Sequence, residues 1–383
     1  MRSIIDVHLD LAWNALHWNR DLTLPLEEMR CSEAAMRDHP ARGRATLTLP
    51  ELSQTQVHVC LGTVLVRSKP EVVPRDGYSR RDLDYRNQTH AHAVGMGQLA
   101  YYEALERQGW VRLLKTAPEL SRHWRQAQAA RGKPLERAAP TPNPPLNDDS
   151  QPPPLGVILA MEGADPILEP SEAQMWWQRG LRAVSLSHYA QGPYAPGTGV
   201  SGHLPHSGRA LLAEFARLGM IVDLSHCAEP AFFEVLELFQ GAVFASHNMC
   251  RKLVPGDRQF SDQQLQALLQ RQAVIGMAFD AWMLTPEWRI GISSPESVNM
   301  AAVADHVDHI CQLAGNTSQV GIGSDLDGGF GNEQSPGDLR RYSDLQRLAD
   351  ILADRNYSDD AIDSIFWRNF LRFFERHLPQ HES

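Results

Sequence analysis

The chain has 383 residues, of which 43% are hydrophobic and 21% charged, a balance typical of a globular protein with a large core and not of a disordered chain. Its 36 basic and 46 acidic residues give a formal net charge of -10. A negative chain is a poor general nucleic-acid surface, because phosphate binding needs a positive field. We therefore expect a small-molecule substrate and no nucleic-acid partner.

Neither secretion nor membrane insertion is indicated by the sequence. The N-terminal MRSIIDVHLD enters an apolar strand pattern at once, which leaves no room for a secretory signal. The chain contains no run of about eighteen consecutive apolar residues, the length needed to span a bilayer. The five cysteines are scattered and include no CxxC pair, so we predict reduced thiols. These features predict a cytoplasmic protein with no membrane partner.

Short apolar, β-branched runs recur along the chain, with helix-like segments between them. Continuous apolar character is typical of parallel strands that are covered on both faces. The predicted strands are 4–8, 57–66, 155–163, 181–188, 220–226, 242–248, 273–280 and 319–325. Helices are predicted over 208–219, 262–272 and 301–315, where apolar residues return every three or four positions.

Alternating strands and helices predict a parallel sheet, and eight strands favour a closed (β/α)₈ barrel of the TIM type over an open doubly wound sheet. The first strand is not followed by a glycine-rich dinucleotide fingerprint, which weakens the open-sheet alternative. Residues 127–154 are rich in Pro, Ala and polar residues. Since the strand count needs both sides of this stretch, we predict a surface excursion within one domain over 1–383. Two closing helices are expected within 343–356 and 358–378, the second beginning at Ser358 or Asp359.

Acidic and imidazole side chains collect at the C-terminal ends of the predicted strands. Barrel enzymes place their active sites there, because the loops that follow the strands converge. His8 and Asp10 form an HxD motif, and side chains two apart on an extended strand point to the same side. Later strands end in further polar residues: Glu162, His188, His226, His247 and Asp325.

This set of side chains points to a metal centre. The pairs Ser225-His226 and Ser246-His247 both end apolar runs, which together with the HxD motif favours metal ligands over isolated hydrogen-bonded histidines. Imidazole and carboxylate donors suit Zn²⁺, and Mn²⁺, Co²⁺ or Fe²⁺ would accept the same donors. One carboxylate can bridge two ions about 3.5–4 Å apart. We predict a bridged pair of ions held by His8, Asp10, Glu162, His226 and His247.

Six sequence motifs, taken together and in this order, form a specific pattern. They are DVHLDLAW (6–13), MEG (161–163), GMIVDLSH (219–226), SHN (246–248), GIGSDLDG (321–328) and NFLRFFE (369–375). The series resembles the membrane (renal) dipeptidase family of zinc peptidases, peptidase family M19 of the amidohydrolase-like barrels, whose opening motif reads DGHNDLPW. The resemblance implies a metallo-dipeptidase with two zinc ions per chain, in which His8 and Asp10 hold one ion, His226 and His247 the other, and Glu162 bridges them.

The same resemblance implies roles for three further residues. His188 would face the substrate and stabilise the oxyanion, Arg258 would bind the substrate carboxylate, and Asp325 would transfer protons. A bridging hydroxide would attack the carbonyl of the dipeptide, with Asp325 accepting the proton and returning it to the leaving amine. The neighbouring Asp327 is expected to hydrogen-bond loop backbone amides, because the glycines that follow it indicate a turn.

Departures from the family pattern are expected to lie around the pocket and not around the metals. Tyr189 and Gln259 stand where the family commonly has Asn, and HLPH (203–206) where GLT is typical. Substrate choice therefore stays open, as do the native metal and the oligomeric state, for which a homodimer is an option. Two alternatives remain: a binuclear enzyme acting on another small amide, an N-acyl amino acid, a lactone or a β-lactam, and a non-catalytic binding protein on the same fold.

Overall fold

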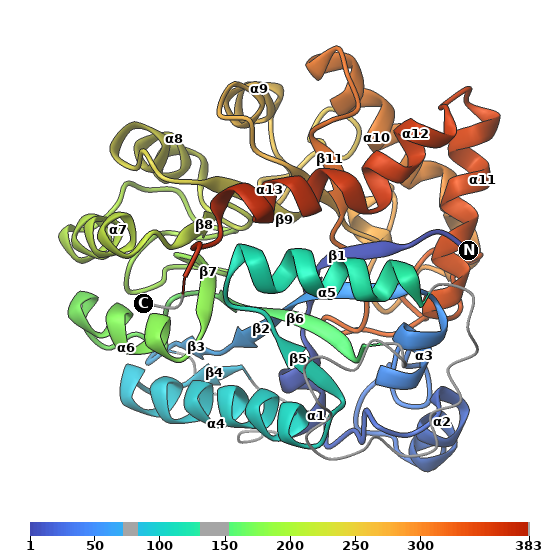
Figure 1. Cartoon of the computed structure of the whole chain (residues 1–383), viewed down its shortest axis with the longest axis horizontal. Coiled ribbons are helices and arrows are strands. Elements are labelled where there is room, and N and C mark those ends of the chain that lie inside the picture. The colour runs from blue at the N-terminus through green and yellow to red at the C-terminus, as the bar shows by residue number, and fades with distance from the viewer. Residues whose placement is uncertain (72–82, 131–152, 382–383) are drawn as a thin grey trace.

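The computed structural model describes residues 1–71, 83–130 and 153–381. A closed barrel of eight parallel strands forms the centre of this structure (Figure 1), which confirms the predicted (β/α)₈ architecture. The ring runs β2-β1-β11-β10-β9-β8-β7-β6 and closes where β6 pairs with β2. Its strands are β1 (Ile4–Leu9), β2 (Val57–Leu65), β6 (Leu155–Glu162), β7 (Leu181–Ser185), β8 (Ile221–Asp223), β9 (Val243–Asn248), β10 (Ile275–Met277) and β11 (Val320–Ile322).

Three short strands were not predicted from the sequence. β5 (Val111–Leu113) pairs in parallel with the first residues of β6. β3 (Arg67–Ser68) and β4 (Asp84–Tyr85) form a separate two-residue ladder directly after β2. Each of these segments contains a charged residue and lacks the continuous apolar character of the eight barrel strands, which is why sequence reasoning missed them.

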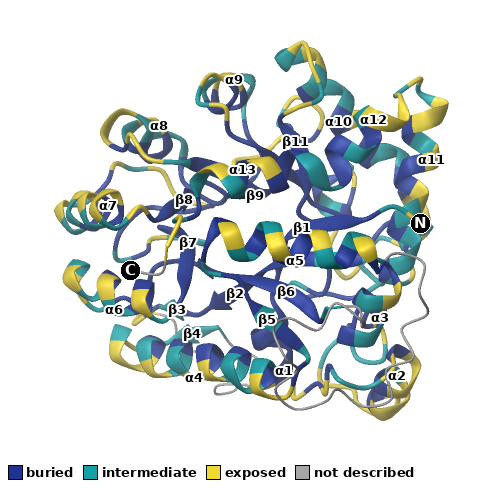
Figure 2. Ribbon diagram, in the orientation of Figure 1, coloured by how far each residue is buried: buried dark blue, intermediate teal, exposed yellow. Residues whose placement is uncertain are grey.

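Helices surround the barrel, with their outer faces exposed and the strands buried inside (Figure 2). The predicted helices 208–219, 262–272 and 301–315 are confirmed as α7, α9 and α10. The α-helices are α1 (Leu11–His17), α2 (Leu26–Glu33), α3 (Leu49–Gln54), α4 (Gln88–Arg107), α5 (Ala117–Ala129), α6 (Ala173–Gln178), α7 (His206–Leu218), α8 (Glu229–Leu238), α9 (Asp262–Gln270), α10 (Ala301–Ala314), α11 (Arg347–Asp354), α12 (Asp359–Asp363) and α13 (Asn369–His377). Short 3₁₀ turns occur at Pro170–Glu172, Ala281–Met283, Pro295–Ser297 and Tyr342–Gln346.

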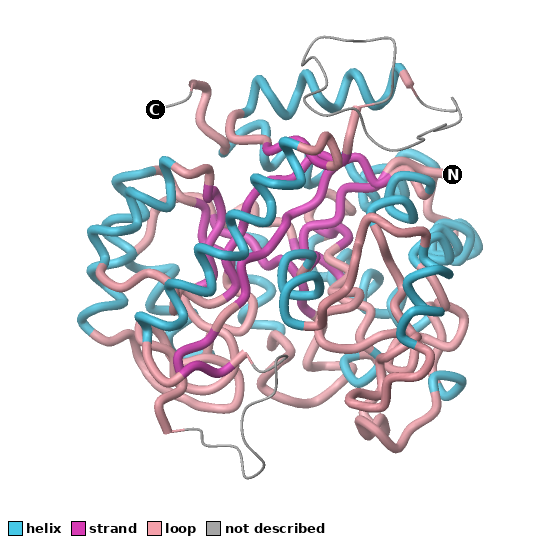
Figure 3. Tube along the Cα trace, turned by 90° about the horizontal axis from the view of Figure 1, so that it is seen from below, coloured by secondary structure: helices cyan, strands magenta, loops and turns pink. Residues whose placement is uncertain are grey.

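Helices α5 and α13 lie side by side across one end of the barrel (Figures 1 and 3). The rings of Trp124 and Trp367 stack with centroids 4.8 Å apart, and Ser121 Oγ donates to Glu375 at 2.6 Å. The buried face of α13 packs on side chains from the first residues of the strands, so this is the N-terminal end of the barrel. The loops that follow the strands gather at the opposite end.

The C-terminal helical region begins as predicted. The side chain of Ser358 accepts a hydrogen bond from the backbone of Ala361, which caps α12. A π-helical turn over Ser364–Arg368 then joins α12 to α13. The aromatic side chains of Phe366, Phe370 and Phe374 in this region are buried.

One predicted boundary is wrong. The polar excursion was expected to begin at 127, but α5 continues to Ala129, and Ala127 is buried against the barrel. Alanine and glutamine are good helix formers, so this composition extends the helix. The rest of the excursion lies largely over 131–152, outside the described residues, and the assignment of one domain to the whole chain stays a prediction.

The five cysteines were predicted to be reduced thiols. None of the five cysteines forms a disulfide, as expected. Burial raises the pKa of Cys227, beside His226, to about 12, so its side chain is a packed thiol. Within the described residues, no helix has the length and apolar character needed to cross a membrane.

Candidate metal centre

The residues predicted as ligands converge on the barrel mouth from strands spread around the ring. His8 lies in β1, Glu162 is the last residue of β6 and His247 lies in β9. Asp10 is the first residue after β1. Each is at most 4% exposed, so their side chains are removed from bulk water.

Three polar residues were expected to end strands, and that placement is wrong. β7, β8 and β11 end three residues before His188, His226 and Asp325, respectively. His226 and Asp325 have φ angles of 64° and 58°, a left-handed conformation that cannot continue a strand. Such strained residues gather at functional sites, where the surrounding structure holds them in place.

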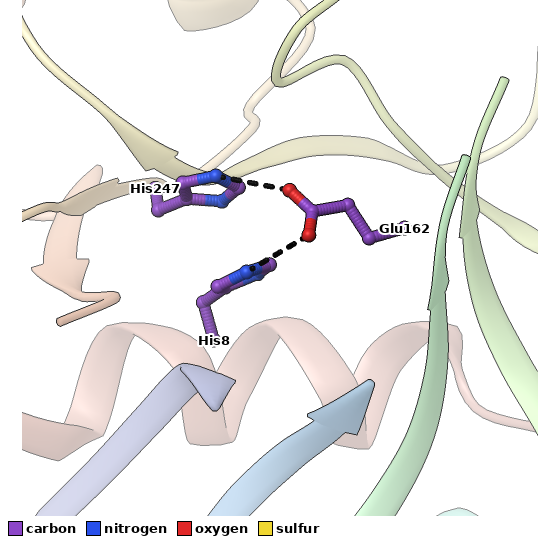
Figure 4. Close-up of side chains that lie close together, drawn as sticks. All are labelled: His8, Glu162 and His247. Carbon is purple, nitrogen blue, oxygen red and sulfur yellow. Dashed lines mark ion pairs between the residues drawn. The ribbon is translucent and has the colours of Figure 1, made fainter. Parts of the chain in front are cut away.

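Glu162 lies at the centre of the cluster. Its Oε1 is 3.2 Å from Nε2 of His226 and 3.2 Å from Nε2 of His247. Its Oε2 is 3.5 Å from Nε2 of His8. Figure 4 shows His8 and His247 approaching different oxygens of the carboxylate. One carboxylate therefore lies between imidazoles on two sides.

The other candidate side chains surround this core. Nε2 of His8 is 3.9 Å from Oδ2 of Asp10 and 3.7 Å from Oδ1 of Asp325. Nε2 of His188 is 3.7 Å from Oε1 of Glu162. Donor atoms within 4.8 Å of one another form three overlapping sets: His8/Glu162/His247, Glu162/His188/His226 and His8/Asp10/Asp325.

The donors present fit a pair of divalent cations. Nε2 of His8 and Oε1 of Glu162 are buried and form no hydrogen bond with any described residue, which is costly unless another partner is bound. Burial lowers the pKa of both His226 and His247 well below the ordinary value. Metal ligation needs neutral imidazoles, and these two are neutral.

The pKa values of Glu162 and His8 shift in opposite directions. Burial alone would raise the pKa of Glu162, but the histidines around the carboxylate, His8 above all, outweigh it and hold that pKa well below the ordinary value. Burial opposes the charge on His8, yet the carboxylates of Glu162 and Asp10 raise its pKa to about 10. The carboxylates therefore attract a positive charge at this point, which a metal ion would supply in place of the proton.

Buried aspartates inside the strands hold the ligand loops. Oδ1 of Asp223 accepts from the backbone N–H groups of Ser225 and Ser246, both at 3.0 Å. Oγ of Ser246 then lies 2.7 Å from Nδ1 of His247. Such contacts orient ligating imidazoles. Asp223 and its counterpart Asp6 were missed, although a carboxylate within an apolar run was visible in the sequence.

Asp325 and Asp327 have different surroundings. Asp325 lines the cavity above the cluster, and burial raises its pKa well above the ordinary value. Asp327 accepts from the backbone of Thr46 at 2.9 Å and from its hydroxyl at 2.7 Å. A further N–H, that of Leu47, lies 3.5 Å away. The predicted loop-binding role of Asp327 is confirmed.

A cavity of about 230 Å³ opens above the cluster of candidate metal ligands. Arg258 lines it and is only 3% exposed, so it is not a solvated surface arginine. Its Nη2 donates to the backbone oxygen of His247 at 2.9 Å, while Nη1 has no hydrogen-bond partner among the described residues. A buried guanidinium with a free donor is suited to an anionic group in the cavity.

Sequence reasoning missed two charged lining residues, Arg67 and Asp280. Arg67 comes directly after the predicted strand 57–66 and Asp280 is the last residue of the predicted strand 273–280, so the rule that found the candidate ligands would also have found them. The expected position of the family departures is partly wrong. Tyr189 lines the cavity, but Gln259 and the segment 203–206 are not among the lining residues. His203 instead pairs with Glu234 on the exposed side of the loop.

Comparison with known proteins connects this geometry to a family. The family model for membrane dipeptidase, peptidase family M19, matches residues 145–381. The chain belongs to this family. The matched region contains Glu162, His226 and His247, and the fold adds His8 and Asp10 to them from the unmatched N-terminal part.

The M19 relatives include two fungal proteins. The chain is 31% identical over 220 residues to dipeptidase aclJ of Aspergillus oryzae, covering 56% of this chain and 50% of that protein. It is 30% identical over 206 residues to dipeptidase tcpJ of Claviceps purpurea, covering 53% and 46%. The chain therefore spans about half the length of the curated relatives it matches.

Solved M19 structures share the fold over nearly the whole chain. Dipeptidase AC, a metallo peptidase of family M19, superposes with a TM-score of 0.73 at 21% identity over 98% of this chain and 99% of that chain. A metallo peptidase from Rhodobacter sphaeroides, solved with a phosphinate mimic of the dipeptide L-Ala-D-Ala, gives 0.73 at 19% identity with the same coverage.

Proposed function

We propose that this protein is a zinc-dependent dipeptidase that hydrolyses the peptide bond of dipeptides. The observation that carries the proposal is the carboxylate of Glu162, buried between His8 on one side and His226 and His247 on the other. Membership of the M19 family supports it, as does the dipeptide mimic bound to the related Rhodobacter sphaeroides enzyme.

In this proposal the chain holds two Zn²⁺ ions. His8 and Asp10 would hold one ion, His226 and His247 the other, and Glu162 would bridge them. Bound ions of this kind act as Lewis acids and lower the pKa of a bound water towards neutrality. Thr63 orients Asp10 by donating its hydroxyl proton to the carboxylate.

In this proposal His188 would donate a hydrogen bond to the reacting carbonyl oxygen. Nη1 of Arg67 lies 3.4 Å from Nδ1 of His188, and a guanidinium can only donate. Nδ1 therefore accepts, and the ring proton sits on Nε2. Burial, opposed by Glu162 and aided by Arg67, lowers the pKa of His188 to about 3. A neutral Nε2–H is thus available to stabilise developing negative charge.

Asp325 would move the proton, and Arg258 would hold the substrate carboxylate. Burial raises the pKa of Asp325, which makes its carboxylate a better proton acceptor near neutral pH. It would take the proton of the attacking water and return it to the leaving amine. Nη1 of Arg258 is free to bind the carboxylate at the far end of the substrate.

The direct test is a hydrolysis screen of L,L- and L,D-dipeptides alongside metal analysis of the purified protein. We expect peptide-bond cleavage that is lost after chelation and restored by Zn²⁺. N-acyl amino acids, lactones and β-lactams belong in the same screen, because the second candidate function predicts cleavage of one of these and not of dipeptides. Metal binding without turnover of any of them would favour a binding protein.

The carboxylate-binding role of Arg258 predicts a selective effect. Arg258→Ala should lower kcat/KM for dipeptides by about 30- to 150-fold, as expected for loss of a charge-assisted bond worth about 2–3 kcal/mol. Dipeptide amides, which lack the carboxylate, should be poor substrates of the unmodified protein and should be little affected by the substitution. If the amides are already as good as dipeptides, Arg258 does not bind that group.

We further propose that the whole chain works as one barrel domain in the cytoplasm, without a membrane partner. Size-exclusion chromatography with light scattering would show whether it is a homodimer. Limited proteolysis would test the single domain. Cleavage within 131–152 that leaves the two fragments associated and active would support it.

A further inference from the structure

Asp280 is a carboxylate in the cavity that the proposed mechanism does not use. It follows β10 and is 5% exposed, and it lines the same cavity as Arg258. It belongs to none of the three candidate metal sets of the described residues. This buried carboxylate therefore has no role assigned to it in the proposed site.

The contacts of Asp280 are all with neutral groups. Nε1 of Trp282 donates to Oδ2 at 2.7 Å, and Nε2 of Gln334 donates to both oxygens at 3.0 and 3.1 Å. Among the described residues, no Lys, Arg or His forms a direct ion pair with it, and the charge of Arg258 acts on it only from a distance within the cavity. A buried carboxylate without a directly paired cation is costly, and burial raises the pKa of Asp280 to about 7, although its bonds to Gln334 and Trp282 and the charge of Arg258 act to lower it.

The barrel order shows which part of a substrate Asp280 would meet. β9 and β10 are neighbours in the ring, so Arg258, which follows β9, and Asp280, which follows β10, belong to the same wall of the mouth. β2 and β6, which lead to Arg67 and Glu162, lie across the ring. The substrate residue whose carboxylate meets Arg258 therefore lies on the side of Asp280.

The wall beside Asp280 also has an apolar component. Trp282 and Met283 line the cavity next to it. An aromatic ring and a thioether can cover the methylene stem of a long side chain while the carboxylate meets its charged end.

We propose that Asp280 is a specificity-determining residue that binds a cationic group on the substrate residue carrying the free carboxylate. The preferred substrates are then dipeptides with a basic second residue, such as lysine, ornithine or arginine. This inference rests on the proposed dipeptidase function and adds the substrate class to it.

The test compares Ala-Lys with Ala-norleucine, whose side chain has the same methylene chain without the ammonium group, each with an L or a D second residue. The unmodified protein should prefer lysine over norleucine by about 10- to 100-fold in kcat/KM, the range of one charge-assisted bond. Asp280→Asn keeps the size and a hydrogen-bond acceptor, and it should abolish the preference mainly through KM. The measured quantity is the ratio of kcat/KM for Ala-Lys to that for Ala-norleucine in each protein, because the loss of the carboxylate also changes the charge around Asp325 for both substrates.

A matched control is Asp308→Asn on α10. Asp308 pairs with Arg355 and hydrogen-bonds Tyr357, and it does not line the cavity. Its loss removes one negative charge of the same kind elsewhere on the molecule. The lysine preference should survive this substitution, which separates a local contact from a general change of charge.

The possible results distinguish this inference from the proposed function. Cleavage of neutral dipeptides without a lysine preference, or an equal loss on both substrates in Asp280→Asn, overturns the role of Asp280 and leaves the dipeptidase function standing. If no dipeptide is cleaved, the proposed function fails and calorimetry decides the role of Asp280. Tighter binding of lysine than of norleucine by the unmodified protein, lost in Asp280→Asn, supports the cation site. Equal binding of the two amino acids, or no binding of either, overturns it.

Discussion

Glu162 contacts candidate ligands from both proposed zinc sites with one carboxylate, its two oxygens lying 3.2–3.5 Å from three imidazole nitrogens. If it bridges two ions, Glu162→Ala should reduce the metal content from close to two ions to near none. Asp10→Ala should remove one ion at most, because only its own site loses a donor. Elemental analysis of the purified variants measures both. Loss of a single ion from Glu162→Ala would contradict bridging.

Asp325 and Asp327 are two residues apart and should respond differently to the same substitution. Asp325→Asn keeps the size of the side chain but removes the proton acceptor, so kcat should fall by about 10²–10⁴-fold with the metals retained. Asp327→Asn should act mainly on stability, since it weakens the bonds to Thr46 and the contact with Arg20, 3.6 Å away.

Steady-state kinetics, metal analysis and thermal unfolding of both variants decide between these outcomes. Near-normal turnover of Asp325→Asn would remove it as the proton carrier. Loss of metal from this variant would instead identify Asp325 as a metal ligand, since its Oδ1 lies 3.7 Å from Nε2 of His8.

Helix α13 stabilises the barrel from the end opposite to the site. Phe370 is 1% exposed and stacks on Phe374, and its ring fills the space that a Cβ on Gly321 would otherwise enter. Phe370→Ala should destabilise the fold by about 3–5 kcal/mol through lost burial and the cavity left behind. Urea unfolding would show a lower midpoint, while kcat of the folded protein should stay unchanged.

The control for this helix is Phe233→Ala on α8. Phe233 is 37% exposed, and a partly exposed ring should cost much less, about 1 kcal/mol or below. An equal loss of stability in the two variants would mean that α13 does not close the barrel as the structure indicates.

At the scale of the whole molecule, two buried neutral histidines predict sensitivity to acid. Burial lowers the pKa of His123 from 6.5 to about 3 and that of His306 from 6.5 to about 4. Between these values and pH 6.5 the unfolded chain binds protons that the folded chain does not. The contribution of these groups is therefore fully favourable above pH 6.5 and is lost as the pH falls towards 3.

Thermal unfolding between pH 4 and 8 measures this effect. We expect the midpoint to fall below pH 6.5, and the double variant His123→Gln/His306→Gln should show a shallower fall, because glutamine does not titrate. Running both proteins in the same buffer cancels the contribution of the metal cluster. A variant with the same pH slope as the unmodified protein would contradict the assignment.

Much of the fold and of the candidate site could be predicted from the sequence. The eight strands were predictable because a parallel strand covered on both faces is continuously apolar, and β1 (4–9) and β9 (243–248) match the predicted ranges closely. The clustering of the candidate ligands was predictable because parallel strands bring their C-terminal ends to one mouth. The resemblance to the M19 family added roles for His188, Arg258 and Asp325 that spacing alone did not give.

Tertiary structure decided what depends on contacts between distant segments. The left-handed turns at His226 and Asp325, the support of His247 by Asp223, and the burial of Arg258 join parts of the chain that no local pattern relates. Asp280 shows the difference most clearly. In the sequence it only ends an apolar run. Its hydrogen bonds to neutral partners, without a direct ion pair, emerge once folding places it in the cavity, because the cost of a buried charge depends on its three-dimensional surroundings.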